Sequence, residues 1–319
     1  MTTTIISRTR QQFDWRAFFQ RYGLLLSFLL LCLALTLASD RFLTTDNLLN
    51  ILRQSTINGI ISVGAMLVIV TRGIDLSVGS VLALATVMTA DMLQQGWDPL
   101  PALVFCLVIG GVLGLINGLL VSLIRIPPFI ATLGMMTFAR GLALSYSEGQ
   151  PITGLGEGFR QIGAGFLGPI PMPIIIAALV FLGGYILLNH IALGQHIFAL
   201  GDNERAAYLT GLPVRRITTF VYIVAGALSA LAGAILIARL NSAQPTAGMG
   251  FEFDAIAAVV VGGTSFEGGE GTLLGTLIGV LIIAVLKNGL NLLDVPSFYQ
   301  GVVQGVVIAL ALLLHRLIR

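Results

Sequence analysis

Residues 99–124 read PLPALVFCLVIGGVLGLINGLLVSLI, and no charged side chain interrupts them. A helix needs about 20 residues to cross the hydrocarbon core of a bilayer, so this run can span it with some tilt. The apolar residues follow one another without the polar alternation of a transmembrane β-strand. The stretch therefore predicts a transmembrane helix and, by extension, an all-α fold.

The composition of the whole chain leads to the same fold class. Of the 319 residues, 56% are hydrophobic and 10% are charged, whereas soluble domains carry about 25% charged residues. A soluble protein of this size needs more charge to cover its surface. The net charge of +2 also argues against a nucleic-acid partner. A polytopic helical membrane protein, surrounded by lipid bilayer, remains.

Apolar stretches of suitable length, charge-free except for Arg140 and Lys287, predict about ten spans. They are residues 22–39, 54–71, 76–90, 99–124, 129–146, 171–189, 217–238, 255–266, 271–290 and 295–314. Residues 255–266 are too few to span as a regular helix and lie beside glycine clusters. We expect a short or broken helix there, buried in protein.

The arginines predict the orientation, because Lys and Arg favour the cytoplasmic ends of spans. Arg8, Arg10, Arg16 and Arg21 precede the first span. With ten spans, most of the remaining arginines fall on the same side. We therefore expect residues 1–21 to be a cytoplasmic segment and residues 22–319 a transmembrane domain, with both termini in the cytoplasm.

Two pairs of short motifs suggest an inverted repeat. Asn117 and Asn288 each begin an Asn-Gly-Leu triplet, and Asp75 and Asp254 each precede a short apolar segment. The two pairs are not the same number of residues apart, so chance similarity is an alternative. A repeat relating the fourth span to the ninth would run in opposite directions across the membrane, as in many transporters.

Motifs for chemistry are absent from the sequence. There is no Gly-x-x-x-x-Gly-Lys-Ser/Thr loop for ATP phosphates, no His-Glu-x-x-His zinc motif and no Gly-x-Ser-x-Gly nucleophile elbow. We expect no catalytic residue, no metal and no cofactor. Ionisable residues within the spans are still candidates for function. Each also has a structural alternative. Asp75 would pair with Arg72 or cap a helix, and Asp254 would cap the short helix. Lys287 would extend its side chain to the membrane–water interface.

Several longer motifs resemble one known family. Residues 71–80, TRGIDLSVGS, and residues 129–136, FIATLGMM, are similar to signatures of the permease subunits of bacterial ABC sugar importers, the ribose/arabinose/xylose group. Residues 199–207, ALGDNERAA, look like the family's ATPase-contacting loop. Residues 242–248 and 254–265 match as well. The resemblance covers nearly the whole chain from Phe42 onward and is strongest to ribose permeases.

The resemblance implies a transport subunit that is not itself an enzyme. A periplasmic sugar-binding protein would deliver a ribose-like monosaccharide, and an ABC ATP-binding protein with two nucleotide-binding domains would drive its transport. Two permease subunits would form the path; a homodimer is favoured, and a pairing with a paralogue is the alternative. The location would be the bacterial inner membrane. Related permeases carry other sugars or a sugar-derived signal such as autoinducer-2, so those substrates stay open. An ion-coupled secondary transporter and a passive channel are further alternatives, disfavoured because the predicted acids cluster at span ends and because a channel needs no coupling loop.

The inner loop, residues 191–216, is expected to carry the ATPase's motion into the bundle. A short helix is predicted between Gly201 and Gly211, with Asp202 or Asn203 as its cap and Gly211 at its end. Small residues in it would allow close approach to a groove on the partner. The predicted coupling residues are Gly201, Asp202, Asn203, Glu204, Ala206, Ala207 and Gly211.

A sugar path should present amide, hydroxyl and aromatic side chains, because neutral sugars offer hydroxyl groups and CH faces. Arg140 lies about halfway along its span, where it either lines the path or forms a structural contact. The predicted path residues are Asn58, Asn117, Thr132, Arg140, Asn288, Gln300 and Gln304. Each could instead bond one helix to another.

Overall fold

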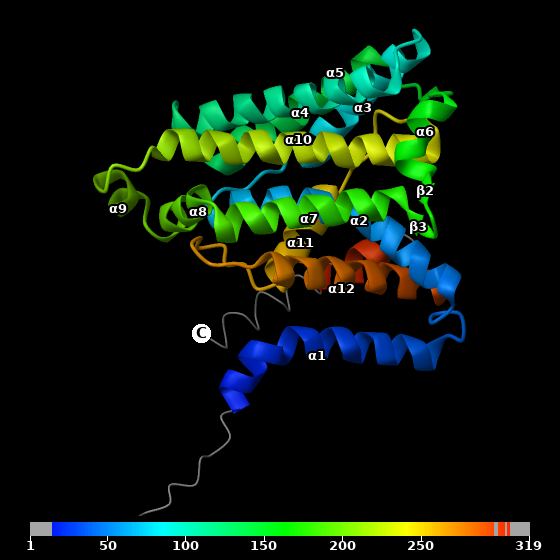
Figure 1. The fold of residues 1–319 in the computed structure, drawn as a ribbon, viewed down its shortest axis with the longest axis horizontal. Coiled ribbons are helices and arrows are strands. Elements are labelled where there is room, and N and C mark those ends of the chain that lie inside the picture. The colour runs from blue at the N-terminus through cyan, green and yellow to red at the C-terminus, as the bar shows by residue number, and fades with distance from the viewer. Residues whose placement is uncertain (1–14, 297–298, 304, 307–319) are drawn as a thin grey trace, which may run out of the picture.

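The computed structural model describes residues 15–296, 299–303 and 305–306. These residues fold into a bundle whose long helices lie side by side along the horizontal axis of Figure 1. The described strands are two short antiparallel pairs, β1 (Ile152–Thr153) with β4 (Ser242–Ala243) and β2 (Phe166–Leu167) with β3 (Ile170–Pro171). The predicted all-α fold is confirmed.

Six described helices are long and apolar enough to cross a membrane. They are α2 (Thr45–Val70), α4 (Pro99–Ser122), α5 (Pro128–Tyr146), α7 (Met172–His190), α10 (Val214–Leu240) and α12 (Leu273–Leu292). Shorter apolar stretches lie in α1 (Trp15–Ala38) and α3 (Val78–Gln94). The class of polytopic membrane protein is thus confirmed. The last predicted span falls mostly outside the described residues, and the total of ten stays a prediction.

Two stretches of irregular backbone lie inside the bundle. The predicted short helix is α11 (Phe251–Val261), which begins after Gly250, a residue with a φ of 85°. Residues 73–77 before α3 are likewise non-helical and mostly buried. The second break, residues 244–250 before α11, touches the first turn of α3, because a Cβ on Gly79 would lie 2.1 Å from the Gly248 carbonyl oxygen. The first break is thus mostly covered by protein, as a bilayer requires, whereas Gln244, Thr246 and Met249 of the second break are exposed.

The centre of the bundle is formed by α2 and α10, which are the most buried of the long helices. α10 packs on α2, α3 and α4. Close packing depends on glycines at the α4–α10 contact: a Cβ on Gly114 would lie 2.2 Å from the Tyr222 carbonyl oxygen, and one on Gly110 2.4 Å from that of Gly226. These small residues let two backbones touch where lipid offers no hydrophobic drive for association.

The packing supports the predicted inverted repeat. α2 contacts α11 and α12, while α10 contacts α3 and α4, so the contacts are preserved when α2, α3 and α4 are exchanged for α10, α11 and α12. α2 and α4 end at Val70 and Ser122, and α10 and α12 end the same number of residues apart, at Leu240 and Leu292. A non-glycine residue of left-handed conformation follows each of these four ends. These are Arg72, Arg125, Asn241 and Asp294.

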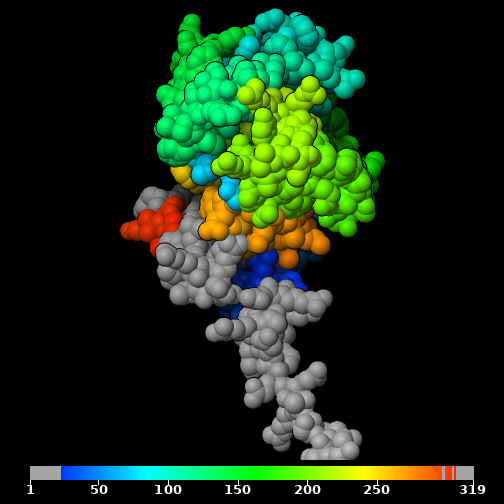
Figure 2. All heavy atoms as spheres, turned by 90° about the vertical axis from the view of Figure 1, so that its left-hand side faces the viewer, coloured from blue at the N-terminus to red at the C-terminus, as the bar shows by residue number. Residues whose placement is uncertain are grey.

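The two ends of the bundle carry different elements. α8 (Ala192–Asp202) and α9 (Glu204–Leu209) lie at the left end of Figure 1, and α6 (Glu157–Ala164) with the strands lies at the right end. Figure 2 looks onto the α8–α9 end, where these helices and the start of α10 form the yellow-green surface. Neither α6 nor α8 was predicted. α6 is held in place by Phe159, which is fully buried.

Candidate coupling surface and interior polar contacts

The α9 helix is defined by signals at both of its ends. The side chain of Asn203 accepts a hydrogen bond from the Ala206 amide at 2.9 Å, so Asn203 is the N-cap. At the other end Gly211 has a φ of 85°. The Gly211 amide donates to the Tyr208 carbonyl and the Leu212 amide to the Ala207 carbonyl, the paired bonds of a Schellman motif. The predicted short helix is confirmed, with Asn203 rather than Asp202 as its cap.

One side of α9 faces the bundle and the other faces outward. Ala207 is buried, whereas Glu204 and Ala206 are exposed. The largest outward side chains are Tyr208 and Leu209, which expose 71% and 76% of their surface. Because exposed apolar groups of this size at the end of a membrane bundle favour a protein contact, they define a candidate docking surface.

The end of α8 is fastened to the end of α2. Arg72 donates from Nε to the Gly201 carbonyl at 2.6 Å and from Nη2 to the Asp202 carbonyl at 2.5 Å. Gly201 is buried, and a Cβ there would lie 1.8 Å from the Val70 carbonyl oxygen. Only glycine permits this approach. Gly201 is therefore a buried part of this anchor, whereas Asp202 contributes its backbone carbonyl to the anchor and is itself exposed.

A third segment joins this anchor. The Gly269 amide donates to the Val70 carbonyl at 3.0 Å. Gly268, at a φ of 81°, lies against the Arg72 side chain. The loop that leads into α12 is thus held at the same point as the ends of α2 and α8. A displacement of α9 would act on α2 and α12 through one hydrogen-bonded junction, which we call the Arg72 anchor.

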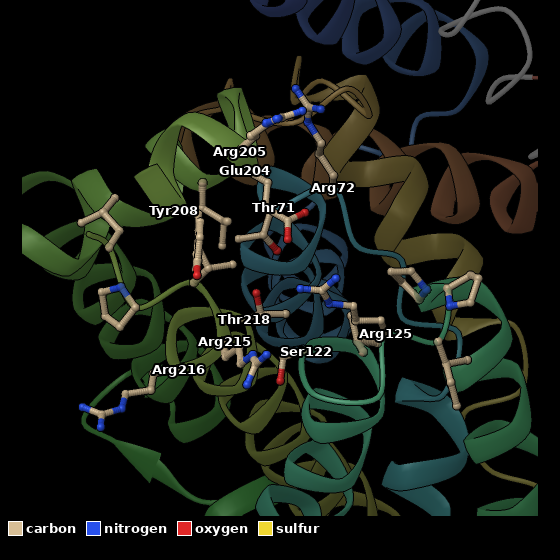
Figure 3. Close-up of a pocket in the computed structure, with 18 residues that line it drawn as sticks. Thr71, Arg72, Ser122, Arg125, Glu204, Arg205, Tyr208, Arg215, Arg216 and Thr218 are labelled. Atoms are coloured by element: carbon tan, nitrogen blue, oxygen red, sulfur yellow. The ribbon is translucent and has the colours of Figure 1, made fainter. Parts of the chain in front are cut away.

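An open cavity of about 1230 Å³ lies beside α9. Figure 3 shows Arg125 and Arg215 directed toward its interior near Ser122 and Thr218, whereas Arg216 points away. The lining includes one carboxylate, that of Glu204. This end of the bundle is therefore strongly basic. The basic lining residues are Arg72, Arg125, Arg205, Arg215 and Arg216.

The first irregular segment, residues 73–77, is held by buried polar groups. Asp75 accepts hydrogen bonds at one oxygen from the Ser77 amide and hydroxyl. Asn117 of α4 donates to the Ser77 hydroxyl at 2.9 Å, and Thr132 of α5 donates to the Ile74 carbonyl at 3.1 Å. Asp75 is therefore neither paired with Arg72 nor a helix cap. Both expectations for it were wrong, because Arg72 turns outward to α8.

The second irregular segment, residues 244–250, is held by Arg140. This side chain donates to the carbonyls of Pro245 and Ala247 at 2.6 and 2.8 Å. A guanidinium offers several donors in one plane, which suits unpaired carbonyls in a non-helical stretch. In this structure the contacts of Arg140 are thus with backbone, and they join α5 to the break before α11.

An ion pair lies between α11 and α12. Lys287 pairs with Asp254, and Asn58 of α2 donates to the same carboxylate oxygen at 3.2 Å. Lys287 was expected to extend toward an interface and Asp254 to cap α11. Both expectations were wrong: α11 begins earlier, at Phe251, and the buried carboxylate draws the lysine inward.

The remaining predicted path residues near the C-terminal helices are also bonded within the chain. Asn288 exchanges hydrogen bonds with Asn47 at 2.8 and 3.1 Å, and Gln300 donates to Asn291 at 2.7 Å. Gln304 lies outside the described residues. Among described residues, no group of three or more His, Cys, Asp and Glu side chains could hold a metal ion.

Sequence reasoning missed Arg72, Tyr208 and Leu209. Tyr208 and Leu209 follow the predicted small residues directly, and an exposed Tyr-Leu pair in a polar loop was an available signal. The role of Arg72 had no such signal, because its partners are carbonyls far away in the chain.

Residues 47–312 match the family described as "Branched-chain amino acid transport system / permease component". The chain belongs to this family. It is 49% identical over 318 residues to the "Ribose import permease protein RbsC" of Bacillus subtilis (strain 168), covering 99% of each chain. The Escherichia coli (strain K12) protein of the same name is 45% identical, with 98% of each chain covered. The "D-allose transport system permease protein AlsC" of Escherichia coli (strain K12) is 39% identical over 99% of this chain and 98% of its own.

No solved structure matches the chain. The family and the apolar helices establish a multi-pass membrane permease component of a transport system. The recognition made from the motifs at residues 71–80 and 129–136 is confirmed, since full-length relatives with nearly half of their residues identical are named as sugar import permeases.

Proposed function

We propose that the chain is the permease subunit of an ATP-driven ABC importer that carries a ribose-like monosaccharide into the cytoplasm. The observation that carries the proposal is the Arg72 anchor behind an outward-facing α9. In this arrangement, a movement of α9 at one end of the bundle would be transmitted to α2 through the Arg72 anchor. The names of two relatives, which specify ribose import, support the substrate class.

The α8–α9 end is assigned to the cytoplasm. Arg72, Arg125, Arg205, Arg215 and Arg216 gather there, as expected for cytoplasmic ends of spans. Both termini would lie on the same side, in a bacterial inner membrane. Residues 191–216 would then face the ATPase, and α6 with the strands would face the binding protein that delivers the sugar.

ATP hydrolysis is assigned to a separate partner with two nucleotide-binding domains. The chain lacks a phosphate-binding loop. Tyr208 and Leu209 would enter a groove on that partner, while Asn203 and Gly211 keep α9 helical. Movement of α9 would pass through Gly201 and Asp202 to Arg72, and from there to α2.

The path is assigned to the interface between two copies of the chain. The described side chains predicted for the path are bonded inside one copy, for example Asn117 to Ser77 and Asn288 to Asn47. Their donor groups hold broken and neighbouring helices in place, whereas the Oδ1 atoms of Asn58 and Asn117 are buried without a hydrogen-bond partner among the described residues. A second copy would complete the lining, and weak sugar contacts there suit a permease whose affinity is supplied by an external binding protein.

Ion-coupled transport is the second class to test, because the carboxylates of Asp75 and Asp254 are buried in the bundle. Both carboxylates already have partners, Ser77 for Asp75 and Lys287 with Asn58 for Asp254. These contacts support a structural role over that of an ion site.

The test is sugar uptake into proteoliposomes. The chain with its ATPase, binding protein and ATP should accumulate labelled ribose, and omission of ATP or of either partner should abolish uptake. Uptake by the chain alone under a sodium or proton gradient would contradict the proposal. Competition by allose, galactose and autoinducer-2 would define the substrate: stronger competition than by unlabelled ribose would overturn the ribose-like assignment.

A further inference from the structure

A groove runs between α4 and α10 next to the cavity of Figure 3. Its volume is about 320 Å³, and its apolar walls are Leu119 of α4, Leu123 just after the end of α4, and Phe220 and Ile223 of α10. Leu119 and Leu123 expose 40% and 55% of their surface. Because these apolar side chains are exposed at the end of a helix that is long and apolar enough to span a membrane, the groove opens on the outer surface of the bundle.

The polar groups on the floor of the groove are already satisfied. A Cβ on Gly118 would lie 2.8 Å from the Thr219 Cα, so the two helices meet closely here. The Ser122 and Thr219 hydroxyl oxygens are 2.9 Å apart and share a hydrogen bond. Each hydroxyl therefore already has a hydrogen-bond partner. A ligand in the groove would be recognised by the apolar walls and by the charge at the end of the groove.

Two arginines close the groove at the α9 end. Arg215 and Arg216 stand in the first turn of α10, and both are exposed. Neither has an ion pair or a hydrogen bond with any described side chain or backbone group, and no carboxylate lines the groove. The N-terminus of α10 adds partial positive charge. Arg125 stands across the adjoining cavity. The groove thus has one strongly basic end without a counterion and one long apolar side.

We propose that this groove binds an anionic phospholipid from the leaflet on the α9 side. The phosphate accepts hydrogen bonds from Arg215 and Arg216, for which guanidinium forks are well suited. An acyl chain lies along Leu119 and Ile223. Basic pockets between transmembrane helices on the cytoplasmic side are suited to such headgroups.

The depth of the groove favours lipid over a soluble acidic protein. The apolar walls include Leu119 of α4 and Ile223 of α10, which lie within the two long apolar helices, whereas the docking surface is on α9. A helix of a second copy would cover these walls, but it would leave both guanidinium groups without an anion. A phospholipid satisfies the charge and the apolar surface together.

The test is phospholipid binding by the purified chain, which is independent of transport. Native mass spectrometry in neutral detergent would measure retention of phosphatidylglycerol and of phosphatidylcholine. The R215Q/R216Q variant should bind phosphatidylglycerol about thirtyfold more weakly than the wild type, with unchanged phosphatidylcholine binding. The matched control R41Q/R160Q removes two arginines at the opposite end and should bind as the wild type does. L119W, which keeps both arginines but fills the apolar wall, should also weaken binding.

Three results would overturn the proposal. One is equal binding of phosphatidylglycerol by the wild type and R215Q/R216Q, with both proteins showing the same thermal unfolding. Another is displacement of the lipid by inorganic phosphate together with an L119W variant that binds normally, which would indicate a free-anion site. The third is retention of the lipid by the single chain together with its loss when two copies associate. That result would indicate that the groove is a contact between copies.

Discussion

Arg72 donates from Nε to the carbonyl of Gly201 at 2.6 Å, although 128 residues of chain separate the two positions. The bond joins the end of a central membrane helix, α2, to the end of α8, which directly precedes the α9 helix that carries the docking surface. The second bond, to Asp202, fixes the direction of the guanidinium. A partner that pulls on α9 therefore pulls on α2.

Replacing Arg72 should uncouple ATP hydrolysis from sugar transport without releasing the ATPase. R72A removes two hydrogen bonds from a charged donor, each worth about 1.5–3 kcal/mol. We expect the ATPase to remain bound and to hydrolyse ATP, while sugar transported per ATP falls severalfold. R72K should restore little of the sugar transported per ATP, because an ammonium group lacks the planar, forked donor geometry of a guanidinium. R41A is the control. Unchanged coupling in R72A would remove this bond from the transmission route.

The close packing around Gly201 predicts that a side chain at this position would destabilise the fold. G201A would place a Cβ 1.8 Å from the Val70 carbonyl oxygen, so we expect a loss of about 2 kcal/mol or more. G141A is the matched control within a helix, since nothing lies within 4 Å of a Cβ there. That change should be neutral or stabilise by about 0.5–1 kcal/mol. Thermal unfolding in detergent would compare them, and equal midpoints would refute the close approach.

The docking surface predicts a loss of affinity rather than of folding. Y208A/L209A removes two side chains that are 71% and 76% exposed, so thermal unfolding of the chain alone should change little. Burial of each in a partner groove would be worth about 1.5–3 kcal/mol, which predicts at least tenfold weaker ATPase binding. L100A, at a lipid-facing position that is 70% exposed, should bind the ATPase normally. Normal binding by Y208A/L209A would place the docking surface elsewhere.

The contribution of the Lys287–Asp254 pair to stability can be measured with a double-mutant cycle. K287M leaves a buried carboxylate without its cation, which should cost about 3 kcal/mol. D254N/K287M removes both charges and should recover part of that loss. Additive effects of the two single changes on thermal unfolding would show that the residues do not interact.

The sequence predicted the membrane class because its signal is local: a charge-free run such as residues 99–124 specifies a span wherever it packs. The short helix α11 and the ends of α9 were equally readable, since Gly250, Asn203 and Gly211 act on their neighbours. The helix α8 was not predicted, because residues 192–202 contain two glycines and only part of an apolar face.

The interior contacts could not be predicted, because their partners are distant in sequence. Lys287 near a helix end normally extends to the interface, and only the fold places it beside Asp254. Arg140 was singled out correctly as an unusual residue, but its partners are carbonyls of residues 245 and 247, which no side-chain pattern reveals. The polar residues of the spans read equally well as a path or as contacts between helices.

Site-specific cross-linking most directly tests whether a separate ATPase drives the bundle through α9. A photo-reactive residue at Tyr208 should cross-link to the ATPase in inverted inner-membrane vesicles, and the yield should change between the ATP-bound and nucleotide-free complex. The same residue at Leu43, exposed near the opposite end, should give no such product. A cross-link to the ATPase from Leu43 and none from Tyr208 would contradict both the orientation and the coupling role of α9.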